Sequence, residues 1–94
     1  MQMVTFDLQH IRDAGEFYRQ FARRFDLCYF GDNLDALWDM LTAGIPLPLR
    51  ITLRHLHHHP HQAELERILR VMQEAEEETG GAFSVRVNAM PAGD

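Results

Sequence analysis

Three short segments in which apolar and polar residues alternate constrain the fold of this chain most strongly. They cover residues 4–8, 49–54 and 83–88. Alternation with a period of two is typical of a β-strand that buries one face and exposes the other to water. The sequence therefore predicts three strands, each with one apolar face that has to be covered.

Helical periodicity fills the intervals between the predicted strands. Apolar residues recur every three or four positions over residues 13–25, 33–43 and 62–79, which is typical of amphipathic helices. Asp13 and Asn33 stand where an N-cap is expected. Gly80 and Gly81 follow the third helix, where glycine commonly ends a helix. The predicted order is strand, helix, helix, strand, helix, strand.

Helical connections between strands predict a parallel sheet with right-handed crossovers. Parallel strands that are covered on both faces usually read as continuous apolar runs, whereas these strands alternate. We therefore predict an α/β fold with two layers. Three short parallel strands carry all the helices on one face and expose the other face to water.

The small size of the chain, 94 residues and 10.9 kDa, predicts a single domain over residues 1–94. No stretch approaches the ~20 apolar residues that span a membrane, and the first residues show no signal peptide. Cys28 is the one cysteine of the sequence, which excludes an internal disulfide and fits a reducing compartment. We expect a cytoplasmic protein with no membrane contact, in which Cys28 packs as a small residue.

Charge is distributed unevenly along the sequence. The chain has 14 acidic and 9 basic residues, a formal net charge of −5, and every basic residue is arginine. Between Asp26 and Pro48 there are aspartates but no arginine, and a second acidic cluster surrounds Glu76. A nucleic-acid-binding surface needs a basic patch that faces phosphate. The aspartate-rich segment therefore predicts a cationic partner and no direct contact with nucleic acid.

The second predicted helix carries much of this acidic segment. At 100° per residue, Leu37 and Leu41 share one side of the helix, whereas Asp35 and Asp39 lie on another. Like charges at positions i and i+4 destabilise an isolated helix by about 0.2–0.5 kcal/mol, and no arginine lies within one turn to offset this. We interpret the helix, which also carries Trp38, as a recognition surface for a basic partner. The alternative is an ordinary solvated helix face.

The stretch that leads into this helix and continues through it is the most specific motif in the chain. It reads Tyr29-Phe30-Gly31-Asp32-Asn33-Leu34-Asp35-Ala36-Leu37-Trp38-Asp39-Met40-Leu41-Thr42 and continues as Pro48-Leu49 into the next strand. This pattern resembles the signature of the barstar family, intracellular inhibitors of the secreted ribonuclease barnase. The order of predicted elements also fits that family over nearly the whole chain.

The resemblance implies a barstar-like fold with its strands in the order 1-2-3, and an inhibitor that is monomeric when free, is not an enzyme and needs no cofactor. Its partner would be a barnase-like ribonuclease or a related basic toxin nuclease. Asp39 would occupy the phosphate-binding site, and Asp35 and Tyr29 would contact other active-site groups. The family also uses a glutamate of the long helix, which matches Glu74 or, as the alternative, Glu76. The remaining implied contacts are Gly31, Asn33, Leu34, Trp38 and Thr42.

The sequence departs from the family pattern just beyond Thr42. The family has a second tryptophan there, whereas this chain reads Ala43-Gly44-Ile45. One aromatic contact of the implied interface is therefore missing.

Three alternative functions follow from other features. The histidine cluster, with His57, His59 and His61 as candidate ligands, favours a metal-binding protein. Its spacing is unlike the His-x-x-x-His pattern of helical metal sites. A metal-dependent phosphoryl-transfer enzyme would use Asp32 together with the two aspartates of the second helix. A protein-interaction module without inhibitory activity is the third alternative.

Overall fold

The computed structural model describes residues 1–88. Its elements, in chain order, are β1 (Gln2–Asp7), a 3-10 turn η1 (Leu8–His10), α1 (Ala14–Arg24), α2 (Leu34–Asp39), a π-helical turn η2 (Met40–Gly44), β2 (Leu49–Arg54), α3 (Gln62–Glu78) and β3 (Phe83–Asn88). The predicted order of strands and helices is confirmed. The predicted single domain over residues 1–94 includes residues 89–94, which lie outside the described part, and it stays a prediction.

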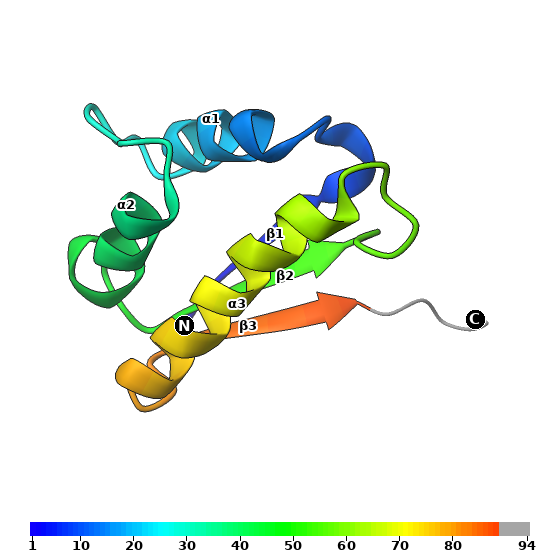
Figure 1. Cartoon of the computed structure of the whole chain (residues 1–94). Coiled ribbons are helices and arrows are strands. Elements are labelled where there is room, and N and C mark those ends of the chain that lie inside the picture. The colour runs from blue at the N-terminus through cyan, green and yellow to red at the C-terminus, as the bar shows by residue number, and fades with distance from the viewer. Residues whose placement is uncertain (89–94) are drawn as a thin grey trace.

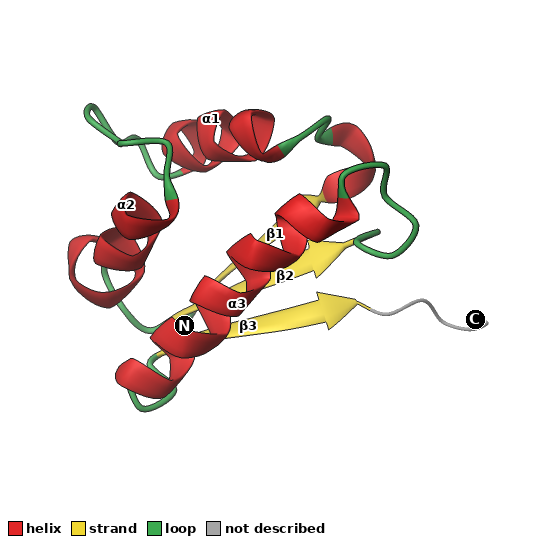
Figure 2. Ribbon diagram, viewed as in Figure 1, coloured by secondary structure: helices red, strands yellow, loops and turns green. Residues whose placement is uncertain are grey.

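The three strands form one parallel sheet in the order β1-β2-β3. In this register Ile51 of the central strand pairs with Val4 on one side and with Val85 on the other. The helices lie together on one side of the sheet (Figures 1 and 2). The predicted α/β fold with two layers and strand order 1-2-3 is confirmed.

The core lies between the sheet and the helices. Leu49, Ile51 and Leu53 of the central strand are at most 1% exposed, whereas the alternating residues Arg50 and Thr52 on the opposite face are partly accessible. Burial of apolar side chains on one face is the main favourable contribution to folding. The alternation of apolar and polar residues in the sequence therefore indicates which face of the sheet the helices cover.

Aromatic side chains join α1 to the edge strand β1. The ring centroid of Phe6 in β1 lies 5.1 Å from that of Phe17 and 6.3 Å from that of Phe21 in α1. Phe21 also contacts Phe25 at 4.9 Å. Aromatic pairs at these separations add to the stabilisation that their burial provides, so this cluster fixes the position of α1 over β1.

The ends of the elements follow the expected capping rules, with two differences. Asp13 and Asn33 cap α1 and α2 as predicted, each through a side-chain oxygen that accepts a backbone N–H three residues later. The first alternating segment was expected to include Leu8, but β1 ends at Asp7 because the Asp7 carboxylate accepts the Gln9 N–H at 3.0 Å and starts η1. Leu8 is nevertheless buried.

The second difference concerns the helix predicted over residues 33–43. It divides into α2 and the π-helical turn η2, in which the Ile45 N–H donates to the Met40 carbonyl oxygen at 2.9 Å. Such five-residue turns often occur at functional sites. Within residues 1–88, every helix is too short or too polar to cross a membrane.

Asp7 connects the ends of β1 and β2. Its Oδ1 lies 2.7 Å from Nδ1 of His55, and its Oδ2 lies 3.8 Å from Nε2 of His10. Burial by itself would raise the pKa of Asp7, but the hydrogen bonds from His55 and the Gln9 amide outweigh it, so that the pKa of Asp7 lies below its ordinary value. The folded chain therefore releases the Asp7 proton more readily than the unfolded chain does.

We expect Asp7→Asn to reduce stability in a pH-dependent way. Asn retains an oxygen that can accept the Gln9 N–H, but it removes the charge that His55 stabilises. Because the pKa of Asp7 is lowered by folding, its charge contributes stability above the pKa of the unfolded chain, about 3.9, and loses that contribution as pH falls through the lower folded value. Urea unfolding at pH 6, 4 and 3 measures the difference.

The matched control is Asp26→Asn, which removes an exposed carboxylate that forms no ion pair within residues 1–88. The destabilisation by Asp7→Asn, corrected for this control, should decrease between pH 4 and pH 3. A difference in unfolding free energy that stays constant from pH 6 to pH 3 would contradict the assigned role.

Candidate functional site

The candidate site is the segment that leads from α1 into α2 and η2, which lies beside α3 (Figure 1). Leu37 of α2 and Leu41 of η2 are fully buried, with an exposed fraction of 0%. Both residues belong to the single core cluster of residues 1–88. Because these two leucines hold one side of the segment against the core, the opposite side necessarily faces solvent.

Phe30 anchors the loop that precedes α2. Its ring centroid lies 5.8 Å from that of Tyr18 and 5.2 Å from that of Phe21, both on α1. The neighbouring Tyr29 is 96% exposed. The loop therefore divides its two aromatic residues between the core and the surface, and Tyr29 is available to a partner. Sequence reasoning assigned no role to Phe30, although two adjacent aromatic residues next to an aromatic helix are a signal for such an anchor.

Asn33 fixes the turn between Tyr29 and α2. Its Nδ2 donates to the Gly31 carbonyl oxygen at 2.8 Å, and its Oδ1 accepts the Ala36 N–H at 2.8 Å. A Cβ atom at Gly31 would lie 3.1 Å from the Cβ of Ala36 and 3.1 Å from Nδ2 of Asn33, which is closer than ordinary packing. Glycine at position 31 thus allows the loop to approach the first turn of α2.

Asp35 and Asp39 are exposed, one helical turn apart. Within residues 1–88, the ion pairs join other residues, and neither aspartate has a cationic side chain within 4.0 Å. Asp35 lies in the first turn, where the helix dipole favours a negative charge, whereas Asp39 has no such stabilisation. The outward side of α2 therefore presents two carboxylates whose charge this chain does not neutralise.

Acidic residues also lie near the junction of α1 and α2. Burial, followed by the charges of Glu64 and Asp32, raises the pKa of Tyr18. Asp32 itself is exposed and has a positive φ of 50°. The acidic surface therefore begins at the loop and continues along the helix.

The C-terminal part of the segment has a defined conformation. The Thr42 hydroxyl donates to the Trp38 carbonyl oxygen at 2.8 Å, and the side chain of Trp38 is partly buried against the core. A Cβ atom at Gly44 would lie 2.6 Å from Cε and 2.7 Å from Sδ of Met40. The Met40 side chain therefore covers the backbone at the place where the family pattern has its second tryptophan.

The two glutamates considered on α3 have different surroundings. Glu74 is exposed and lines a hollow of about 370 Å³ together with Leu34 of α2. The Glu76 carboxylate accepts the Val85 N–H at 3.0 Å and is half-buried. Glu76 thus holds α3 to β3, whereas Glu74 lies beside α2 and is free to contact a partner.

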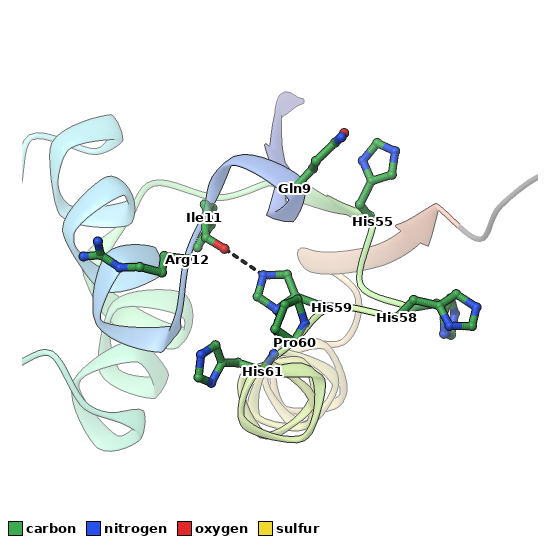
Figure 3. Close-up of a pocket in the computed structure, with 9 residues that line it drawn as sticks. Gln9, Ile11, Arg12, His55, His58, His59, Pro60 and His61 are labelled. Atoms are coloured by element: carbon green, nitrogen blue, oxygen red, sulfur yellow. Dashed lines mark hydrogen bonds between the residues drawn. The ribbon is translucent and has the colours of Figure 1, made fainter.

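The histidine cluster follows β2. Within residues 1–88, no three histidine, cysteine, aspartate or glutamate side chains are placed to hold a metal ion. His55, His58 and His61 point in different directions (Figure 3). They line a hollow of about 420 Å³. The alternative based on His57, His59 and His61 as ligands therefore finds no support in the geometry.

His59 instead connects two loops. Its Nδ1 accepts the His61 N–H at 2.9 Å, and its Nε2 lies 2.7 Å from the Ile11 carbonyl oxygen (Figure 3). A carbonyl oxygen can only accept, so Nε2 carries the proton and donates it. Both ring nitrogens are thus occupied by the loops after β1 and β2.

The expectation that Cys28 packs as a small residue is wrong, because its side chain is exposed.

The comparisons with known proteins place the chain in a family. The sequence matches the family described as Barstar (barnase inhibitor) over residues 1–88. The chain therefore belongs to the barstar family, and the resemblance carried by residues 29–42 is confirmed. A curated relative from Bacillus subtilis (strain 168) is named "Putative ribonuclease inhibitor YrdF". It is 39% identical over 59 residues, which are 61% of this chain and 65% of that relative, so the match spans just under two thirds of the relative.

We expect His59→Ala to lower the free energy of unfolding by about 1–3 kcal/mol, because it leaves the buried Ile11 carbonyl without its donor. The matched control His57→Ala changes an exposed residue of the same loop and should stay within about 0.5 kcal/mol. Urea unfolding measures the free energy of unfolding of both variants.

Addition of Zn²⁺ or of a chelator should leave the melting temperature of the wild-type chain unchanged. A Zn²⁺-dependent rise that His57→Ala abolishes would instead support a metal site.

Proposed function

We propose that this chain inhibits a barnase-like ribonuclease, or a related basic toxin nuclease, by inserting the acidic side of α2 into the active site of that enzyme. The single observation that carries the proposal is the exposure of Asp35 and Asp39 without a neutralising cation among residues 1–88. Membership of the barstar family and the printed name of the Bacillus relative support the same function.

The mechanism follows from the charge that a ribonuclease active site must carry. Such a site stabilises the negative charge that develops on a phosphate during RNA cleavage, and it does so with arginine, lysine and histidine side chains. Two carboxylates one helical turn apart, about 5.4 Å along the helix axis, can bind these cations in place of RNA phosphates. Inhibition then results from occupancy alone, and the inhibitor needs no catalytic residue and no cofactor.

The rigidity of the segment lowers the entropic cost of binding. Asn33 holds the loop to the first turn through two hydrogen bonds of 2.8 Å, and Phe30 packs on α1. A surface that is already ordered before binding loses little conformational freedom in the complex. Tyr29, Asp35 and Asp39 are therefore proposed as the principal contacts. Gly31, Asn33, Leu34, Trp38, Thr42 and Glu74 are proposed to complete the interface.

We propose a cytoplasmic inhibitor that is monomeric before it binds, which agrees with the free and exposed Cys28, because a reducing compartment keeps such a thiol from forming disulfides.

The decisive experiment is an inhibition assay with purified protein against a panel of barnase-like ribonucleases, using a fluorogenic RNA substrate. At least one ribonuclease of the panel should lose activity in proportion to the amount of inhibitor added. The inhibitor itself should not bind RNA. Absence of inhibition across the panel at micromolar inhibitor would contradict the proposal. Binding without loss of activity would instead indicate a non-inhibitory interaction module.

We expect Asp39→Ala to weaken the complex most, by about 2–5 kcal/mol, because it leaves partner cations buried without a counter-charge. Asp35→Ala and Tyr29→Ala should follow, because charged and aromatic residues at the centre of an interface dominate its affinity. The dissociation constant of each variant, measured by titration of Trp38 fluorescence, checks this order.

Two control variants separate local contacts from general charge attraction. Arg19 is paired with Glu16 at 2.8 Å on α1, so Arg19→Ala should change binding by less than about 0.5 kcal/mol. Asp26→Asn removes one negative charge that lies before the motif of residues 29–42 and should also have a small effect. Equal effects of Asp39→Ala, Asp26→Asn and Arg19→Ala would show diffuse attraction and contradict the proposed contacts.

We also expect affinity to fall as salt concentration rises, mainly through a slower association rate. Charges on separate molecules attract over a Debye length of about 10 Å at 0.1 M salt, and added ions shorten this range. Stopped-flow measurements at 0.05 and 0.5 M NaCl test the dependence. An association rate that does not change with salt would contradict electrostatic steering by the acidic segment.

A further inference from the structure

Two adjoining hollows extend the surface of α2 toward α3, which contacts α2 (Figure 1). The first, of about 390 Å³, is lined by Tyr18, Asp35 and Glu64 among others. The second, of about 370 Å³, is lined by α3 residues as far as Glu74. Leu34 and Arg67 line both hollows. The two hollows therefore adjoin at Leu34 and Arg67, and we refer to them together as the groove between α2 and α3.

The groove carries charges of both signs. Arg67 lines both hollows and Arg70 lines only the second. The carboxylates are Asp35 and Glu64 in the first hollow, and Glu66 and Glu74 in the second. The groove therefore combines two arginines with carboxylates on both sides of them. Arg67 and Arg70 are exposed, and neither has a carboxylate within 4.0 Å among residues 1–88. Their guanidinium groups are available to a partner.

The size of a stable interface requires the partner to contact surface beyond α2, and the groove adjoins α2. A specific complex buries about 800 Å² on each partner. α2 has six residues, so it is only about 9 Å long at 1.5 Å per residue, and its outward side cannot supply that area. A partner that contacts Asp35 and also reaches Glu74 has to lie across Arg67 and Arg70.

A partner surface that is cationic throughout would meet repulsion at these two arginines. An arginine that faces another cation in an interface is unfavourable, whereas a carboxylate can bind its guanidinium through two parallel hydrogen bonds. The two arginines beside the acidic side of α2 are therefore complementary to a cationic centre that has an acidic neighbour.

We propose that the partner carries a carboxylate-bearing rim beside its cationic cleft, and that this rim docks on Arg67 and Arg70 in the groove between α2 and α3. The proposal rests on the proposed inhibition of a ribonuclease and adds a feature of that partner. Arg67 and Arg70 then determine which ribonucleases bind, because an enzyme without the acidic rim is repelled there.

The test compares charge reversals whose effects have opposite signs. Arg67→Glu and Arg70→Glu each make the chain more negative, and so does the matched control Arg23→Glu on α1, where Arg23 is exposed and forms no ion pair in residues 1–88. The probe is the ribonuclease of the panel that the wild-type chain inhibits most strongly. Association rates and dissociation constants are measured by stopped-flow fluorescence.

The two groove variants should raise the dissociation constant by about tenfold, which corresponds to 1.4 kcal/mol, because each replaces an attraction with a repulsion. Arg23→Glu should leave affinity unchanged or increase it by about twofold, because added negative charge speeds association with a cationic enzyme. Replacing an acidic rim residue of the ribonuclease with lysine should restore the affinity of Arg67→Glu. This charge exchange would locate the contact.

An increase in affinity by Arg67→Glu and Arg70→Glu, as for Arg23→Glu, would overturn the proposal and show a uniformly cationic partner. The neutral variants Arg67→Gln and Arg70→Gln keep the test valid if a reversal impairs folding, and they should raise the dissociation constant by about threefold. Loss of affinity by Asp39→Ala without any loss by the groove variants refutes the acidic rim alone. Unchanged affinity with Asp39→Ala refutes the proposed insertion of the acidic side of α2 into the active site, and absence of inhibition across the panel refutes the proposed inhibition.

Discussion

The burial of Leu37 and Leu41 is the interaction on which the acidic surface of α2 depends. Both leucines are 0% exposed, and burial of a leucine side chain contributes about 1.5–3 kcal/mol. Repulsion between Asp35 and Asp39 costs only about 0.2–0.5 kcal/mol. The hydrophobic contribution therefore exceeds the electrostatic cost several-fold. A helix of six residues would not persist in water without such anchoring.

The same anchoring separates stability from recognition within one short segment. Residues that face inward, such as Phe30 and Leu37, hold the backbone, and residues that face outward, such as Tyr29 and Asp39, contribute little to the core. The outward charges can thus be matched to a partner without weakening the fold. The arginines of residues 1–88 that form ion pairs, Arg12 and Arg19, lie on or next to α1, so the charge of α2 remains available.

The histidine-rich loop shows how composition and structure can favour different functions. Four of the five residues 57–61 are histidines, a composition that favours metal binding. In the structure His59 instead satisfies the Ile11 carbonyl oxygen at the turn between η1 and α1. A buried backbone carbonyl needs a donor, and an imidazole can supply one from a distant segment. The role of His59 therefore depends on a contact between residues 48 positions apart.

The sequence by itself determined the strands, the helices, their N-caps and the division of α2 into a leucine side and an aspartate side. These features depend on the spacing of residues within one segment. A period of two or of 3.6 residues predicts which side chains share a face. The tertiary structure alone decided where the elements meet. The end of β1 at Asp7, the packing of Phe30, the exposure of Cys28 and the groove that joins Leu34 to Arg67 all arise from contacts between segments. Local periodicity carries no information on such contacts, because they depend on how distant side chains fill space around a shared core.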